Sequence, residues 1–259
     1  MLSKSTNDHK GGNLLATNGC SRLIQLNKQH SLYIAFEAKV KGDLAIHRSI
    51  IDESKQKNAY NFALSKETIK LLKSNIKLAG IGPIVREALG QSELVWHTPC
   101  GMYAKSVEDP FAYDFKQIDG SGFWHRDSVG QVVKIFICVD SLQNGGVQTE
   151  FINGTHCMDP FVREWEMARA TLEPDALLRF TQYVSGKYAA RILSIDLKAG
   201  QCYAFNTNAV HRGVYINKQI GTRITAQMSI TTKNNAFLFD RFHGTTDLAT
   251  AEEFDCVAL

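Results

Sequence analysis

The sequence predicts a mainly β protein with flanking helices, whose core is an antiparallel sandwich or barrel. Short runs rich in β-branched and aromatic residues follow one another from residue 94 to residue 230, and Gly, Asn, Asp or Pro separates most of them. These runs are LVWHT, GMYAKSV, AYDFKQI, VVKIFICV, VQTEFI, RILSIDL, QCYAF, GVYI and RITAQMSI. The length of 259 residues suits one domain of this kind with helical additions.

The segment before the β-rich region is expected to form a loose N-terminal arm and then helical support. Residues 1–30 are polar and rich in Gly, Asn and Ser, whereas residues 31–95 carry helical patterns. In LSKETIKLLKSNIKLAG, apolar residues recur at helical spacing behind Ser65, a predicted N-cap, and Gly80 ends the run. A second short helix, PIVREALG, is expected to begin at Pro83.

The β core is assigned to residues 96–232, with a helical insert at 160–184 and a C-terminal tail at 233–259. Prolines open both halves of the insert, PFVREWEMARATLEP and PDALLRFTQYV. The insert follows the turn NGTH near the expected mouth of the barrel, so a packing role and a lid role both stay open. No repeat divides the chain, so residues 1–259 are treated as a single domain.

Composition excludes several classes of protein. The formal net charge of +3 is not concentrated in any Lys/Arg cluster, so a nucleic-acid partner is not expected. No stretch approaches the ~18 apolar residues of a membrane span, and the first residues lack the apolar core of a signal peptide. The six cysteines form no C-x-x-C pair, which is typical of reduced thiols in a cytoplasmic protein.

A candidate metal site begins with the sequence FWHRD. Residues i and i+2 of a strand share a face, so His125 and Asp127 would direct an imidazole and a carboxylate to one point. His211, just past the strand-like run QCYAF, offers a third ligand. Two histidines and one carboxylate form the facial triad of non-heme Fe(II) enzymes, which leaves coordination positions open. A structural ion pair between His125 and Asp127 is the alternative.

A candidate anion site follows on the last β-rich run. Arg223 and Thr225 in RITAQMSI share a strand face. A guanidinium beside a hydroxyl suits a carboxylate group.

With these motifs the chain resembles the Fe(II)/2-oxoglutarate-dependent dioxygenases, and among them the phytanoyl-CoA dioxygenase-like family. The similar segments are FWHRD, VVKIFICVDSLQNGGVQTEFINGTH, GQCYAFNTNAVHRG and RIT, which occur in the family's order over about residues 100–232. The resemblance implies a double-stranded β-helix, a jelly-roll or cupin-like core with helices packed outside. It also implies an enzyme that uses Fe(II), O₂ and 2-oxoglutarate, and releases succinate and CO₂.

The resemblance assigns Fe(II) to His125, Asp127 and His211, and the distal carboxylate of 2-oxoglutarate to Arg223 with Thr225. Gln117 and Lys134 are further candidates for the cosubstrate or substrate wall. Relatives that halogenate lack the metal-binding carboxylate. Because Asp127 is present here, hydroxylation or another oxidation of an unactivated C–H bond is the expected reaction, with desaturation and ring closure left open.

The substrate is expected to be a small molecule, in specialised or natural-product metabolism. Candidate substrate contacts are Glu150, Asp119, Trp124 and Arg212. If Glu150 or Asp119 faces the cavity, a cationic substrate is expected. Three alternatives stay open: a cupin-type metalloenzyme without 2-oxoglutarate, an acyl-CoA hydroxylase of the phytanoyl-CoA type, and a non-catalytic binding protein with this fold.

Overall fold

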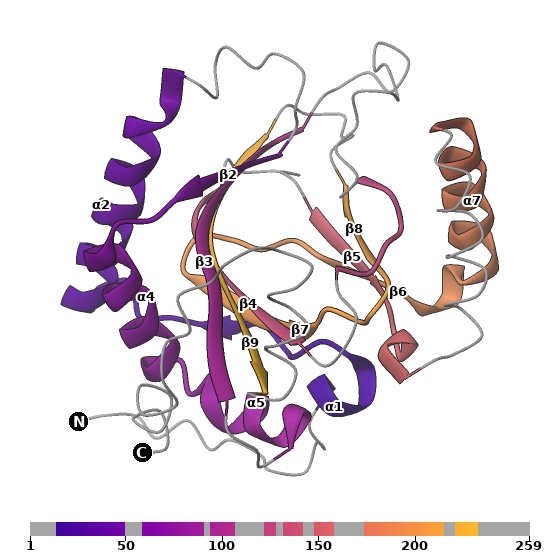
Figure 1. The fold of residues 1–259 in the computed structure, drawn as a ribbon, viewed down its shortest axis with the longest axis horizontal. Helices are drawn as coiled ribbons and strands as arrows, with labels where there is room; N and C mark the ends of the chain where they lie inside the picture. The colour runs from indigo at the N-terminus through magenta and orange to yellow at the C-terminus, as the bar shows by residue number, and fades with distance from the viewer. Residues whose placement is uncertain are drawn as a thin grey trace.

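The computed structural model describes residues 14–49, 59–90, 94–106, 122–127, 132–141, 148–157, 174–214 and 221–232. Two antiparallel sheets dominate these residues, one six-stranded and one three-stranded (Figure 1). The sheets face each other, and helices cover their outer sides. The predicted mainly β fold with flanking helices is confirmed.

The larger sheet has the strand order β1-β7-β4-β9-β3-β2. Its strands are β1 (Ile24–Gln25), β7 (Gln201–Asn206), β4 (Val132–Ser141), β9 (Thr222–Thr232), β3 (Leu94–Lys105) and β2 (Ala59–Ala63). Strand β9 lies between β3 and β4, and Thr225 pairs with Met102 on one side and Cys138 on the other. Strand β9 is therefore a central strand of the larger sheet, paired on both edges.

The smaller sheet has the order β6-β5-β8, with β6 (Ile192–Ile195), β5 (Gln148–Ile152) and β8 (His211–Val214). An isolated bridge between His125 and His211 adds one further residue pair at the free side of β8. From β3 onward the chain passes repeatedly between the two sheets, since β4, β7 and β9 belong to the larger sheet and β5, β6 and β8 to the smaller one. Such passage between two facing antiparallel sheets is typical of a double-stranded β-helix.

The helices are α1 (Leu14–Asn18), α2 (Ser31–Ile46), α4 (Lys66–Leu78), α5 (Ile81–Leu89) and α7 (Pro174–Lys187), with 3-10 turns at Thr155–Cys157 and Ala189–Arg191. Figure 1 shows α2 and α4 along the outer side of the larger sheet and α7 beside the smaller one. Among the described helices, none is both long and apolar enough to cross a membrane.

The two helices predicted around Gly80 are present. Ser65 caps α4, since its side chain accepts a hydrogen bond from the Thr68 backbone N–H. The second helix begins at Ile81, two residues before the expected Pro83. Gly80, with φ of 65°, turns the chain between the helices. Pro83 lies in the first turn of α5, where a backbone N–H has no intrahelical partner to lose.

The secondary structure of the N-terminal third differs from the prediction at two places. Strand β2 forms within the segment expected to be helical and becomes an edge strand of the larger sheet. Helix α1 and strand β1 form within the expected loose arm, and β1 pairs with β7. Of the predicted insert, only α7 is described. Its first half and the tail at 233–259 lie outside the described residues, so the lid role stays a prediction.

Two apolar layers hold the sheets in place. One lies between the larger sheet and α2, α4 and α5, and includes Cys202. The other lies between the two sheets, where Phe136 stacks on Tyr203 at 5.5 Å and Phe151 contacts Phe205 at 5.0 Å, measured between ring centroids. Cys138 belongs to this inner layer, and both Cys138 and Cys202 are buried. Phe136 and Phe205 of this layer also line a cavity between the sheets.

Candidate metal centre

His125 and His211 are held side by side by their own backbones. His125 N donates to His211 O at 2.9 Å, and His211 N donates to His125 O at 3.0 Å. The Nδ1 atom of His125 lies 2.6 Å from Phe123 O, and that of His211 lies 2.8 Å from Ala209 O. A carbonyl oxygen only accepts, so each Nδ1 carries the proton and each Nε2 keeps its lone pair for a metal.

Asp127 completes the group. Its backbone N–H donates to Thr207 O at 3.2 Å, which fixes the residue after the bridge. Its Oδ1 lies 3.3 Å from His125 Nε2 and 3.4 Å from His211 Nε2. Adjacent ligand atoms of one octahedral divalent ion, each about 2.1 Å from it, stand about 3 Å apart. The three side chains thus have the spacing of a facial triad.

The charge states also suit metal binding. Burial alone would raise the pKa of the Asp127 carboxyl, but the Lys134 ammonium and the two imidazoles outweigh it and hold that pKa well below its ordinary value. Burial lowers the pKa of His211, against the attraction of Asp127. At neutral pH the carboxylate is therefore ionised and His211 is neutral, which are the forms that bind a metal.

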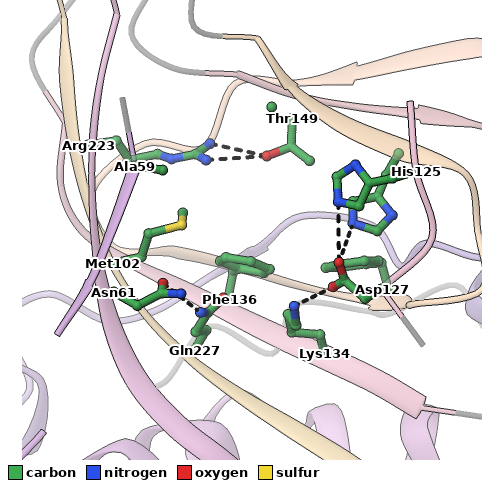
Figure 2. A pocket seen from close by; sticks show the side chains of 13 residues that line it. Ala59, Asn61, Met102, His125, Asp127, Lys134, Phe136, Thr149, Arg223 and Gln227 are labelled. Atoms are coloured by element: carbon green, nitrogen blue, oxygen red, sulfur yellow. Dashed lines mark hydrogen bonds and ion pairs between the residues drawn. The ribbon is translucent and has the colours of Figure 1, made fainter. Parts of the chain in front are cut away.

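A cavity of about 190 Å³ opens from these ligands. Its described lining residues are Ala59, Asn61, Met102, His125, Asp127, Lys134, Phe136, Thr149, Phe205, His211, Gly213, Arg223 and Gln227. In Figure 2 the metal-site residues lie on one side, and Arg223, Met102 and Asn61 lie on the opposite side. The triad and Arg223, 12 residues beyond His211 in sequence, therefore share one cavity.

Arg223 is a buried cation without a described anionic partner. Its side chain is 3% exposed, and Nη1 and Nη2 lie 3.4 and 3.3 Å from Thr149 Oγ1 (Figure 2). The buried polar atoms without a hydrogen-bond partner among the described residues include Arg223 Nε and the Thr225 hydroxyl. A buried guanidinium left unpaired is costly. The guanidinium at this end of the cavity could bind an anion.

Lys134 lies in the cavity, as predicted, but its ammonium contacts Oδ2 of Asp127 (Figure 2). Thus one carboxylate oxygen faces the two imidazoles and the other faces Lys134. Thr225 lies next to Arg223 on the same strand face but is not a lining residue. Gln117 and Asp119 lie outside the described residues.

The other predicted substrate contacts point elsewhere. Glu150 accepts hydrogen bonds from Arg212, with Nε at 2.8 Å and Nη2 at 2.7 Å. The Arg212 guanidinium stacks over Trp124 at 4.6 Å, and Trp124 Nε1 donates to Ser185 of α7 at 2.9 Å. This network joins the smaller sheet to α7, away from the cavity lining. The substrate roles of these three residues stay predictions without support from the described geometry.

Several lining residues were not predicted from the sequence, namely Thr149, Asn61 and Gln227. The signal for Thr149 was strand alternation: in QTEFI, Thr149 and Phe151 face inward, whereas Glu150 faces outward. Gln227 follows Arg223 by four residues on β9, and so shares its face. Asn61 carried no local signal, because its place depends on the pairing of β2 with β3.

Solved structures share this fold. AviO1 from Streptomyces viridochromogenes Tue57 matches over 85% of this chain and 92% of its own, with a TM-score of 0.51 at 13% identity. The non-heme α-ketoglutarate-dependent carbocyclase SnoK from nogalamycin biosynthesis matches over 87% of both chains, with a TM-score of 0.52 at 11% identity. EctD from S. alaskensis, with 2-oxoglutarate and 5-hydroxyectoine, matches over 86% of this chain and 75% of its own, with a TM-score of 0.51 at 12% identity.

No protein-family model matches the chain, and no curated protein sequence matches it. The similarity to solved structures is one of fold, since the identities are low. It confirms the predicted double-stranded β-helix and the resemblance to non-heme α-ketoglutarate-dependent enzymes at the level of the fold. The His-x-Asp…His group lies within that fold at the described positions.

Proposed function

We propose that this protein is an Fe(II)- and 2-oxoglutarate-dependent oxygenase that hydroxylates an unactivated C–H bond of a small molecule in natural-product metabolism. One observation carries the proposal. A group of two histidines and one carboxylate lines the same cavity as a buried guanidinium that has no anionic partner among the described residues. A metal alone would account for the triad, whereas a bound anion would supply the partner that Arg223 lacks among the described residues.

The donor set fits Fe(II). His125, Asp127 and His211 supply two nitrogens and one oxygen, which suits a non-heme iron site with open positions. When bound there, Fe(II) supplies the activation of O₂ that is coupled to oxidative decarboxylation of 2-oxoglutarate to succinate and CO₂. The two backbone bonds between His125 and His211 and the contact of Lys134 with Asp127 hold the ligands in place.

The other end of the cavity fits the distal carboxylate of a dicarboxylic keto acid. Arg223 can offer a planar fork of N–H donors to that carboxylate. Thr149 already contacts the guanidinium, and Thr225, two residues further along β9, has a buried hydroxyl without a partner among the described residues. A metalloenzyme without an anionic cosubstrate would leave this buried cation unexplained. The cupin-type alternative therefore receives no support from the described residues.

The remaining lining restricts water and orients the ligands. Phe136 and Phe205 form an apolar floor beneath the triad, and Met102 lines the opposite wall. A dry, shaped floor protects a reactive centre from side reactions and positions one C–H bond of the substrate. Asp127 occupies the ligand position that must be vacant for halide in the halogenating relatives, which supports hydroxylation.

The class of metabolism rests on the similar structures. SnoK belongs to nogalamycin biosynthesis, and EctD was solved with 5-hydroxyectoine, a small hydroxylated molecule. SnoK is a carbocyclase, so this fold also serves an outcome other than hydroxylation. Small natural products are therefore the substrate class proposed here.

Calorimetric titration of 2-oxoglutarate into the Mn(II)-loaded protein tests the proposal without a known substrate. The wild type is expected to bind one equivalent, and Arg223→Ala is expected to bind at least about tenfold more weakly, as for the loss of a charged hydrogen-bonded contact. Arg212→Ala is the matched control, because this arginine pairs with Glu150 outside the cavity. Equal 2-oxoglutarate affinity in wild type and Arg223→Ala would refute the cosubstrate assignment.

A further inference from the structure

Two carboxamide side chains in the cavity have no role in the proposed chemistry. Asn61 of β2 and Gln227 of β9 lie at the side of the cavity opposite the metal ligands (Figure 2). Gln227 Nε2 lies 3.4 Å from Asn61 Oδ1 and 2.9 Å from Cys100 Sγ. Gln227 is 7% exposed, whereas Asn61 is exposed at the edge strand. The pair therefore extends from the interior toward the rim.

The number of hydrogen-bond donors and acceptors that Asn61 and Gln227 leave unused does not depend on which of the two side chains donates to the other. Each carboxamide has one oxygen acceptor and two N–H donors. One bond between the pair uses one oxygen and one N–H, whichever residue donates. One full NH₂ group and one full C=O group stay available. Within the described part of the chain, the side chain of Asn61 hydrogen-bonds only that of Gln227, and the side chain of Gln227 hydrogen-bonds only those of Asn61 and Cys100.

Among the described lining residues, no charged side chain is left to pair with a ligand bound beside Asn61 and Gln227. Asp127 and Lys134 form an ion pair, and Arg223 faces the position proposed for the cosubstrate carboxylate. Glu150, the residue that would have attracted a cation, is paired with Arg212 outside the cavity. The wall is thus a neutral surface that both donates and accepts hydrogen bonds. A hydroxyl or an amide matches both functions, whereas an ammonium only donates and a carboxylate only accepts.

We propose that Asn61 and Gln227 form the substrate-recognition wall, and that the substrate group bound against β2 and β9 is an uncharged hydroxyl or amide. This inference rests on the proposed function, because it takes Arg223 and the triad as occupied by cosubstrate and metal. It replaces the cationic substrate that Glu150 suggested in the sequence. The proposal also makes Gln227 a specificity-determining residue, because its side chain hydrogen-bonds both Asn61 and Cys100.

Three probes of the same shape and different charge test the wall: acetamide, acetate and acetamidinium. The protein is loaded with Mn(II) and 2-oxoglutarate, and each probe is titrated while the paramagnetic relaxation of its methyl protons is measured by NMR. Binding near the metal gives a saturable enhancement. Acetamide is expected to bind most tightly of the three. A preference for acetate or acetamidinium, or no saturable enhancement for acetamide, would overturn the proposal.

Variants of Gln227 test whether acetamide binds beside Asn61 and Gln227 or at another position near the metal. Gln227→Met keeps the side-chain length and removes the amide, and is expected to weaken acetamide binding about fivefold, as for one lost hydrogen bond. Gln227→Glu is expected to reverse the preference toward acetamidinium. Gln148→Met is the matched control, since Gln148 bonds Ser194 and does not line the cavity. Unchanged acetamide affinity in Gln227→Met would contradict the proposed role of Gln227 in substrate recognition.

Failure of this inference is distinguishable from failure of the proposed function. Before the probes are added, free Mn(II) is measured by its EPR signal and 2-oxoglutarate binding by calorimetry. If metal and cosubstrate bind but acetamide shows no preference, the wall is wrong and the oxygenase proposal stands. If neither binds, both proposals fail.

Discussion

His125 and His211 exchange a pair of backbone hydrogen bonds, at 2.9 and 3.0 Å, although 86 positions separate them in sequence. The bridge sets both imidazoles on one side of the smaller sheet, with ring centroids 4.4 Å apart. Each ring is further fixed by its Nδ1 contact with a carbonyl two residues back. The two nitrogen ligands are therefore preorganised by the backbone and need no metal to bring them together.

Replacing Asp127 by Ala should abolish most metal affinity. The change removes the only anionic ligand of the triad and leaves Lys134 as an uncompensated charge beside the site. A loss of at least about 100-fold in Mn(II) affinity is expected, measured by EPR titration of free Mn(II). Asp140→Ala is the control, because this carboxylate pairs with Lys41 at the surface. Similar losses in the two variants would contradict the site.

Replacing Arg223 by Met should remove the stabilisation of the fold by 2-oxoglutarate without destabilising the unliganded protein. The guanidinium is buried without a described anionic partner, so its removal should leave the unliganded protein at least as stable as the wild type. In the wild type with Mn(II), 2-oxoglutarate at 100 times its dissociation constant should stabilise the fold by about 2.7 kcal/mol. Thermal unfolding should show that stabilisation in the wild type and little of it in Arg223→Met. Equal stabilisation of the variant would argue against Arg223 as the cosubstrate contact.

Two glycine substitutions should change stability in opposite directions. A Cβ at Gly101 would stand 2.1 Å from Phe62 Cζ, so Gly101→Ala must displace a buried ring between β2 and β3. Overpacking of this kind costs about 1–3 kcal/mol. Gly42 lies within α2 with open space at its Cβ position, so Gly42→Ala should stabilise by up to about 1 kcal/mol. Urea unfolding measures both, and a stabilising Gly101→Ala would show that this part of the sheet is packed differently.

Thiol reactivity should follow burial. Burial raises the pKa of Cys20 and of Cys202 to about 12, and that of Cys138 likewise to about 12. Since the thiolate is the reactive form, these three should resist alkylation at pH 8 in the native protein, whereas exposed Cys157 should react. Peptide mapping after iodoacetamide treatment, with a urea-unfolded control, measures this. Rapid native labelling of Cys138 would contradict the described inner layer.

Local signals predicted that His125, Asp127 and Arg223 would lie together, because their placement depends on strand periodicity and short motifs. His125 and Asp127 are two residues apart, and Arg223 and Thr225 are again two apart, so alternation placed them on shared faces. The caps of α4 were local in the same way. Strand β2 was not predicted, since AYNFA is a short edge strand that forms only by pairing with a segment about 40 residues later.

The substrate side of the cavity depended on such distant pairing. Glu150 looked like a cavity carboxylate from its position near the motifs, but alternation on β5 turns it outward to Arg212. Asn61 enters the cavity only because β2 lies beside β3 and β9 follows on the other side. The sequence therefore predicted the grouping of the candidate metal ligands better than it predicted the residues on the opposite wall of the cavity.

The most direct test of the oxygenase assignment is the visible absorption of the anaerobic protein with Fe(II) and 2-oxoglutarate. A keto acid chelated to iron in a facial triad gives a weak charge-transfer band, so the wild type should show the band and Asp127→Ala should not. At the same cosubstrate concentration, Arg223→Ala should show a much weaker band. Iron that binds tightly in the wild type without any band on addition of 2-oxoglutarate would contradict the account.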